Sequence, residues 1–233
     1  MLRELIRAFG SDDITGLQMA AMLARFAGVV FVMLFGLSAH ECAHGWAAKK
    51  LGDNTAWMHG RLTLNPGKHL DLFGSLLILL VGFGYAKPVP VNPRNFKNYK
   101  KGMALTAAAG PASNLIMAFV FSLFTSAAYF FNQRSPNEFT FLVVVFFSAI
   151  FTTNVGLAVF NLLPIPPLDG SRILDLFLPA KASMFLARYE RYMIYGVMAL
   201  LFLGVLTVPI AYLSSLIAGG IGYVTGLPFR LLG

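Results

Sequence analysis

The amino-acid sequence predicts an all-α polytopic membrane protein: a three-helix core, C-terminal helices, and a small membrane-associated β or re-entrant element. Of its 233 residues, 57% are hydrophobic and only 12% are charged, whereas a soluble domain carries about a quarter charged residues. Three long runs, 102–133, 139–168 and 192–229, contain no Asp, Glu, Lys or Arg, and 26–40 is also uncharged. Because a spanning helix needs about 20 largely apolar residues, each long run can hold at least one span.

The chain begins with a short charged segment and then enters its first span. Residues 1–16 mix Arg, Glu and Asp with a few apolar residues, which is typical of an amphipathic lead-in and not of a cleavable signal peptide. The first helix is predicted over 17–49, where two lysines and then Gly52 close it. We expect three units: the lead-in at 1–16, a core at 17–185 and C-terminal membrane helices at 186–233.

The β or re-entrant element is predicted over 58–93. The alternating sequence RLTLN indicates a short strand, and 72–86 is an apolar run of 15 residues with three glycines. Such a run is short for a span, and a non-helical one at membrane depth must be buried in protein. The alternating prolines of KPVPVNP forbid a helix and favour an extended edge strand.

Two further spans follow, and a last apolar stretch closes the chain. They are predicted over 102–131 and 139–163, and the second ends at NLLPIPPLDG, where three prolines break the helix before Asp169. The last apolar run, 192–229, holds either two spans or one span and an interfacial segment. Whether 209–227 spans stays open at this point.

The basic residues predict which loops share a side of the membrane. Lys and Arg number four in 49–69, five in 86–101 and four in 164–191, but one in 132–138. Positive-inside bias therefore places the first three segments in the cytoplasm and 132–138 outside, provided that 70–86 enters and leaves on one side. The C-terminal ends of the first and third spans then lie on the same side.

The net charge of +8 does not indicate a nucleic-acid partner, because the basic residues lie in the loops between apolar runs. That distribution is typical of membrane topology, so the expected surroundings are a lipid bilayer. The single cysteine, Cys42, excludes an intrachain disulfide. Nothing in the sequence predicts an oligomeric state.

The helix of the first span carries the sequence His40-Glu41-Cys42-Ala43-His44, an H-E-x-x-H motif. Residues four apart share one helical face, so both imidazoles can bind a single Zn²⁺. Glu41, next to the first ligand, is placed to accept a proton from zinc-bound water. Ionisable side chains within an apolar span are costly and usually functional. The alternative is a helix end whose polar residues face water.

A hydrolytic zinc has three protein ligands and an open position for water, so one further ligand is needed. Asp169 is the first choice, since it follows the proline-broken helix at the depth that the topology assigns to the motif. Gly170 would allow a sharp turn there. Asp71 is the second choice and His69 a weaker one. Asp169 can alternatively cap a helix that begins near Ser171.

Two amides lie in apolar spans, Asn114 in GPASN and Asn161 in NLLPIPPLDG. An unpaired polar group in lipid costs several kcal/mol, so each must have a partner. They either bind the backbone of a substrate strand or hold one helix against another.

HECAH within a span, GPASN in the next and NLLPIPPLDG at the end of the third resemble the site-2 protease family of intramembrane zinc metalloproteases. RLTLNPGKH and AKPVPVNPRNF also look like a compact prokaryotic branch of it. The resemblance implies a three-helix catalytic core, with His40, His44 and Asp169 as zinc ligands and Glu41 as the base. It also implies that the β element, here 58–93, lies near the substrate.

Regulated intramembrane proteolysis is therefore the implied function: hydrolysis of a peptide bond in or near a transmembrane segment of another protein. The implied location is a prokaryotic plasma membrane, crossed several times. The chain has no room for the PDZ domain of many relatives and no nucleotide-binding domain, so the substrate and its regulator stay open.

Two other classes of membrane protein are weighed against a protease. A metal-ion transporter would need polar residues in facing helices, and 102–133 and 192–229 contain no histidine or acid. A scaffold that retains a structural zinc favours four ligands, and no fourth strong ligand is evident.

Overall fold

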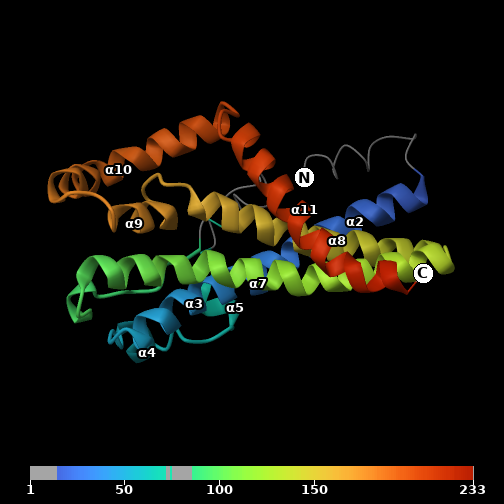
Figure 1. The fold of residues 1–233 in the computed structure, drawn as a ribbon, viewed down its shortest axis with the longest axis horizontal. Coiled ribbons are helices and arrows are strands. Elements are labelled where there is room, and N and C mark those ends of the chain that lie inside the picture. The colour runs from blue at the N-terminus through green and yellow to red at the C-terminus, as the bar shows by residue number, and fades with distance from the viewer. Residues whose placement is uncertain (1–14, 72–73, 75–85, 233) are drawn as a thin grey trace.

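The computed structural model describes residues 15–71, 74 and 86–232, and the described chain consists of helices and short connections (Figure 1). Within the described residues, four helices are long and apolar enough to cross a membrane: Gly16–Lys50, Tyr99–Arg134, Glu138–Leu162 and Thr207–Leu231. The prediction of a helical membrane protein is confirmed.

The first span combines α2 (Gly16–Phe31), a π-helical turn (Val32–Gly36) and α3 (Leu37–Lys50). Thr15 caps its start, because its side chain accepts a hydrogen bond from the Gln18 amide while the Gln18 side chain accepts one from Thr15. The predicted limits of 17–49 are correct to within one residue at each end.

The next two spans also form close to their predicted limits. α7 (Tyr99–Arg134) begins at the cap Asn98, and α8 (Glu138–Leu162) begins at the cap Asn137. Each asparagine side chain accepts a hydrogen bond from the third amide of its helix, which satisfies an otherwise unpaired donor. α8 ends at Leu162, because the prolines that follow in NLLPIPP exclude a helix.

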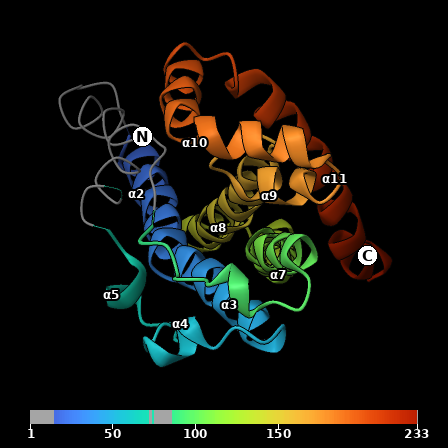
Figure 2. The same cartoon turned by 90° about the vertical axis from the view of Figure 1, so that its left-hand side faces the viewer.

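Three helices follow α8: α9 (Asp169–Asp175), α10 (Ala180–Phe202) and α11 (Thr207–Leu231). α11 is a candidate span, whereas α10 is not among the candidate spans. The last apolar stretch therefore holds one span among the described residues. α11 packs on α7 and α8, while α10 crosses above α9 (Figure 2).

The helices pack closely where small residues lie between them. α7 contacts α3, α8, α9 and α11, and α2 lies along α8. A Cβ atom added at Gly28 of α2 would lie 2.8 Å from both the Ala149 Cβ and the Phe146 carbonyl of α8, so only glycine permits this approach. The core joins α7, α8 and α11 through Ala118, Phe151, Val155 and Val159, with Phe121, Ile210, Ile217, Ala218 and Ile221 around them.

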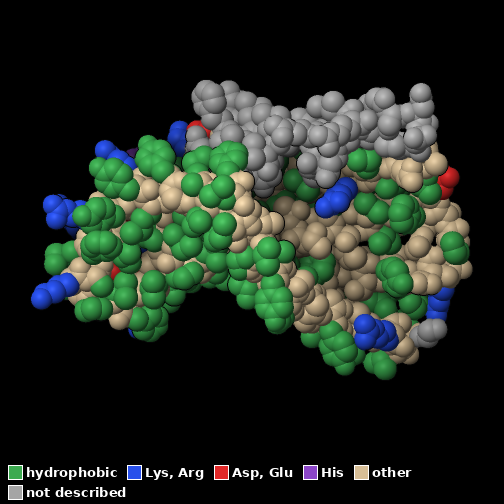
Figure 3. Space-filling view, turned by 90° about the horizontal axis from the view of Figure 1, so that it is seen from above, with side chains coloured by type: hydrophobic (Ala, Val, Ile, Leu, Met, Phe, Trp, Pro, Cys, Tyr) green, Lys and Arg blue, Asp and Glu red, His purple; other side chains and the backbone are tan. Residues whose placement is uncertain are grey.

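The outer surface is largely apolar. Large hydrophobic side chains are exposed along every candidate span, for example Leu23, Phe131, Phe139 and Leu216. In Figure 3 hydrophobic side chains cover much of the visible face, and Lys and Arg side chains gather most clearly at its left-hand end. This pattern is the one a lipid-facing surface with charged ends requires.

The predicted β element at 58–93 is not supported. Its described part holds the end of α4 (Thr55–Met58), the helix α5 (Pro66–His69) and an isolated antiparallel bridge between Leu70 and Ala86, but no strand. The RLTLN strand does not form because Asn65 caps α5 instead, its side chain accepting the Gly67 amide at 3.0 Å. Most of the proposed re-entrant run, residues 72–73 and 75–85, lies outside the described residues.

The buried carboxylate of Asp53 holds the segment after Ala86 in place by hydrogen bonds. Asp53 is fully buried and accepts hydrogen bonds from the Asn92 amide and the Asn95 side chain, each at 2.7 Å, and also from Thr55. Burial by itself raises the pKa of this carboxyl, but the hydrogen bonds outweigh burial and lower the pKa below its ordinary value. Asp53 therefore contributes stability above the unfolded pKa, and this contribution is lost as pH falls through the lower folded pKa.

The ends of the spans group as the topology prediction requires. Arg134, at the end of α7, donates a hydrogen bond to the Leu232 carbonyl after α11 at 2.9 Å, so 132–138 and the end of α11 share one end of the bundle. The C-terminal end of α3, the N-terminal end of α7 and the C-terminal end of α8 lie toward the other end (Figure 1). Their sidedness stays a prediction.

We expect cysteines introduced at Asn92 and Gln133, in a Cys42→Ala background, to react from opposite sides of the membrane. The basic loops should be cytoplasmic, so a membrane-impermeant maleimide added outside intact cells should label only Gln133→Cys. Labelling of Asn92→Cys from outside would mean that 70–86 crosses the membrane.

Candidate metal centre

Two elements far apart in the sequence place three possible metal ligands together. His40 and His44 lie one turn apart on α3, and Asp169 is the first residue of α9. Their nearest ligand atoms are separated by 3.0 Å (His40 Nε2 to His44 Nε2), 3.2 Å (His40 Nε2 to Asp169 Oδ2) and 3.4 Å (His44 Nε2 to Asp169 Oδ2). Among the described residues this is the one group of His, Cys, Asp and Glu with that arrangement.

Hydrogen bonds at the far nitrogens determine how both imidazoles are protonated. His44 Nδ1 lies 2.8 Å from the Thr106 carbonyl, and His40 Nδ1 lies 2.6 Å from Asn114 Oδ1. A carbonyl oxygen can only accept, so each Nδ1 carries a proton and donates it. In a neutral imidazole Nε2 is then the free acceptor that a metal requires.

The atoms that can give an electron pair to a metal are arranged to fit a zinc ion. Two Nε2 lone pairs face each other, and Asp169 Oδ2 is buried without a hydrogen-bond partner. Such electron-rich atoms repel one another unless a cation lies between them. Tetrahedral ligands at about 2.0–2.1 Å from zinc lie about 3.3 Å from one another, which agrees with the observed separations of 3.0–3.4 Å.

Gly110, in the GPASN sequence of α7, makes room for the two imidazoles. A Cβ atom added there would overlap His44 Nε2 and would lie 2.6 Å from His40 Cε1. Any side chain at this position would therefore occupy the space beside the ligand atoms. The absence of a side chain lets α7 lie against the metal-binding face of α3.

Asp169 reaches the histidines because α9 begins directly against the end of α8. The helix starts at Asp169 itself, and its cap, Leu168, makes no side-chain hydrogen bond, so the capping alternative for Asp169 is wrong. Gly170 is needed for a different reason from the predicted turn. A Cβ atom there would overlap the Leu162 carbonyl group, whereas the positive-φ glycines in the described chain are Gly52, Gly60 and Gly204.

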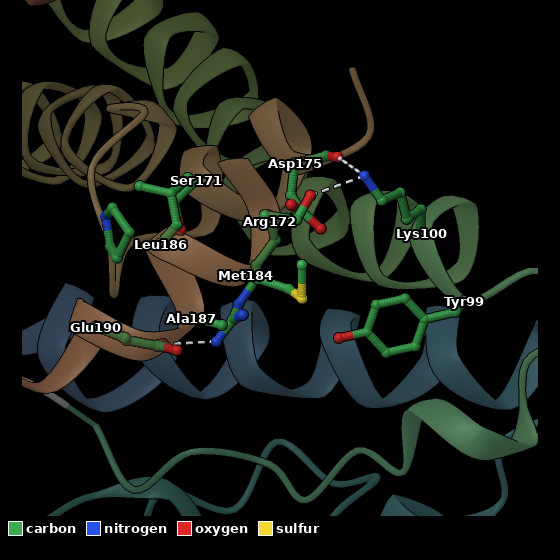
Figure 4. A pocket seen from close by; sticks show the side chains of 11 residues that line it. Tyr99, Lys100, Ser171, Arg172, Asp175, Met184, Leu186, Ala187 and Glu190 are labelled. Carbon is green, nitrogen blue, oxygen red and sulfur yellow. Dashed lines mark hydrogen bonds and ion pairs between the residues drawn. The ribbon is translucent and has the colours of Figure 1, made fainter. Parts of the chain in front are cut away.

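A cluster of polar contacts holds α9 from its other end (Figure 4). Lys100 of α7 donates hydrogen bonds to the carbonyls of Asp175 and Leu178, at 2.9 and 2.6 Å, and so satisfies the C-terminal end of α9. Arg172 and Glu190 form an ion pair of 2.6 Å between α9 and α10. Lys100, Arg172, Asp175 and Glu190 help to line a cavity of about 220 Å³, and none of the three ligand residues lines it. Their contacts position Asp169 because they hold α9 in place.

Glu41 lies next to the ligand cluster but is not part of it. Its carboxylate accepts a hydrogen bond of 2.9 Å from the Val89 amide, in the proline-rich segment that Asp53 fastens. The side chain is partly buried. Glu41 thus follows the first ligand directly on α3, and its role as the base stays a prediction.

The other candidate ligands lie elsewhere. Asp71 accepts a hydrogen bond of 2.9 Å from the Gly74 amide, and His69 is fully buried with Nε2 2.7 Å from the Thr63 carbonyl. Neither belongs to the cluster. His59 contacts the Thr55 carbonyl through Nδ1.

The two predicted substrate-binding amides have different surroundings. Asn114 is fully buried and contacts His40, which favours the helix-fixing alternative. Asn161 is partly buried, and its side-chain NH₂ donates to the Leu157 carbonyl of its own helix at 3.0 Å. Contact of either with a substrate stays a prediction.

Sequence reasoning missed two contributors to the site. Gly110 is the first residue of the GPASN motif, and a glycine inside a predicted span can indicate that another helix approaches closely. Thr106 contributes its carbonyl group, which every residue has, so nothing in the sequence could have marked it.

The fold and the site define a membrane zinc metalloprotease, and comparison with known proteins agrees. The family model of peptidase family M50 matches residues 28–205. The chain belongs to this family, as its resemblance to site-2 proteases predicted. No solved structure matches it significantly.

Curated relatives carry the name putative zinc metalloprotease. YwhC of Bacillus subtilis is 42% identical over 70% of this chain and 75% of its own length. MJ0611 of Methanocaldococcus jannaschii is 30% identical over 69% and 76%, and Rip2 of Mycolicibacterium smegmatis is 30% identical over 64% and 57%. With the His-His-Asp group, these names support Zn²⁺ as the cofactor.

The third ligand is tested by removing each candidate carboxylate. We expect Asp169→Ala to lose bound zinc and activity, because the loss of a ligand exceeds the tenfold to hundredfold effect typical of neighbouring residues. Asp71→Ala, the matched control, should retain its zinc. Metal content of the purified variants decides the matter, and the opposite pattern would assign the ligand to Asp71.

Proposed function

We propose that this protein hydrolyses a peptide bond in or near a transmembrane segment of a membrane-protein substrate. The observation that carries the proposal is the ligand cluster of His40, His44 and Asp169 inside an apolar helical bundle. The plasma membrane of a prokaryote is the proposed location, since the relatives come from bacteria and an archaeon.

In the proposed mechanism the chain's own side chains bind the metal and move the proton. His40, His44 and Asp169 hold Zn²⁺, which when bound supplies a Lewis acid for the scissile carbonyl and lowers the pKa of water. Glu41 accepts the proton of the attacking water and returns it to the leaving amine. Glu41 suits this role because it adjoins a ligand yet lies outside the ligand cluster.

The substrate must be extended at the cut, because a helical peptide bond is shielded by its neighbours. The segment 87–91 is the proposed partner for such a strand, by β-augmentation. Pro88 and Pro90 have no N–H, so the donors of Lys87, Val89 and Val91 share one edge. In the structure Lys87 donates to the His69 carbonyl at 2.7 Å and Val89 donates to Glu41 at 2.9 Å. Val89 therefore points its N–H at Glu41 of α3, while Lys87 points its N–H at the end of α5.

A metal-ion transporter is the alternative. It would move zinc across the membrane without cutting any peptide, whereas a protease cuts and keeps its metal. The experiment below separates the two.

We expect Glu41→Gln to abolish cleavage of a single-span model substrate in proteoliposomes while leaving zinc bound, because the base is not a ligand. Glutamine keeps an oxygen that can accept the Val89 amide but cannot take a proton from water. The readouts are product formation by gel and metal content. Cleavage at the wild-type rate would refute the assignment of Glu41, and zinc uptake by vesicles without cleavage by the wild type would favour the transporter.

We expect Val89→Pro to lower cleavage at least tenfold without loss of zinc, because it removes both the central donor of the edge and the N–H that Glu41 accepts. Pro88→Ala is the matched control. It restores an N–H on the opposite edge, so it should cleave at close to the wild-type rate. Equal rates for Val89→Pro and wild type would exclude pairing at this edge.

A further inference from the structure

A chain of two buried amides runs from His40 into the third span. Asn114 Oδ1 lies 2.6 Å from His40 Nδ1, Asn114 Nδ2 donates to Asn154 Oδ1 at 2.9 Å, and Asn154 Nδ2 donates to the Ile150 carbonyl at 2.9 Å. Both asparagines are fully buried. The chain thus connects α3, α7 and α8 within the membrane-spanning bundle.

The hydrogen bonds of this chain can run in only one direction from donor to acceptor. The Ile150 carbonyl cannot donate, so Asn154 must turn its NH₂ group toward it and its oxygen toward Asn114. Asn114 must then present its NH₂ group to Asn154 and its oxygen to His40. His40 Nδ1 therefore holds the proton, and Nε2 is left free for the metal. A backbone carbonyl of α8 determines the tautomer of a ligand on α3.

We propose that Asn154 is a positioning residue of the metal centre, acting through Asn114 to hold His40 in its metal-binding tautomer. The inference rests on the proposed role of His40 as a zinc ligand. Without Asn154, the Asn114 amide is free to rotate and point its NH₂ group at His40. His40 would then favour a proton on Nε2, where it blocks the metal.

The packing around Asn154 agrees with this role. A Cβ atom added at Gly36 would lie 3.3 Å from Asn154 Oδ1 and 2.7 Å from Val32 Cγ1. The π-helical turn Val32–Gly36 therefore ends on a residue without a side chain where Asn154 lies. Asn154 is also an amide in an uncharged span, the same sequence signal that marked Asn114 and Asn161.

The first test measures zinc affinity of the purified full chain in detergent, by competition with a chelator and without substrate. Asn154→Leu should bind zinc 10-fold to 100-fold more weakly, the range for residues that orient a metal ligand. Asn154→Asp should stay close to wild type as a neutral carboxyl group, because its O–H can donate to the Ile150 carbonyl while its other oxygen accepts from Asn114. Thr152→Val, which loses an exposed hydroxyl that bonds only within α8, is the matched control and should bind zinc normally.

The second test separates tautomer control from simple helix packing. In an Asn114→Asp background the carboxylate can only accept from His40, so the orientation no longer depends on Asn154. Asn154→Leu should then cost less than about threefold in zinc affinity. A merely structural Asn154 would cost as much in this background as in the wild type.

The inference is overturned if Asn154→Leu binds zinc like the wild type, if its cost is undiminished by Asn114→Asp, or if Asn114→Asp alone loses zinc. Should Asn154→Leu not fold, Asn154→Val replaces it, since valine is smaller and equally unable to accept. Because no substrate is involved, a failure of the proposed proteolysis leaves this measurement intact.

Discussion

Three electron-pair donors that face one another inside an apolar bundle impose a constraint on the rest of the molecule. His40 Nε2, His44 Nε2 and Asp169 Oδ2 lie 3.0–3.4 Å apart, an arrangement that a shared cation stabilises and that mutual repulsion otherwise opposes. Two neighbouring helices are positioned for this contact. α7 approaches because Gly110 has no side chain, and α9 is held in place by Lys100 at its far end. The helices thus pack around three polar side chains that lipid could not solvate.

The same rule governs the polar groups behind the ligands. Buried donors and acceptors in a membrane must find partners within the protein, and here each partner also orients a ligand. The Thr106 carbonyl directs His44, and the two buried amides direct His40. The same hydrogen bonds therefore pair the buried polar groups and orient the two histidine ligands. Behind His40 and His44 the protein meets this requirement with neutral groups, two amides and a backbone carbonyl.

The helices were predictable because their signal is local. Charge-free runs, the closing lysines with Gly52 and the proline break placed the three core spans to within about three residues of the structure. The β element at 58–93 was not predictable in the same way. Alternation in RLTLN is short, and a strand exists only where another strand pairs with it. In the described residues Asn65 starts a helix there instead, and the pairing is limited to Leu70 with Ala86.

The sequence by itself determined the metal chemistry, because an H-E-x-x-H pair needs only the helical repeat to bring His40 and His44 to one face. Charge counts also placed the end of the third span beside that helix, which made Asp169 the first choice over Asp71. What only the tertiary structure decided are the contacts between helices: the fit of Gly110 against the imidazoles, the overlap that requires Gly170, and the direction of the amide chain from Ile150. The physical reason is that these depend on distances between residues about 40 or more positions apart, or on backbone carbonyls that every residue shares, and neither leaves a pattern along the chain.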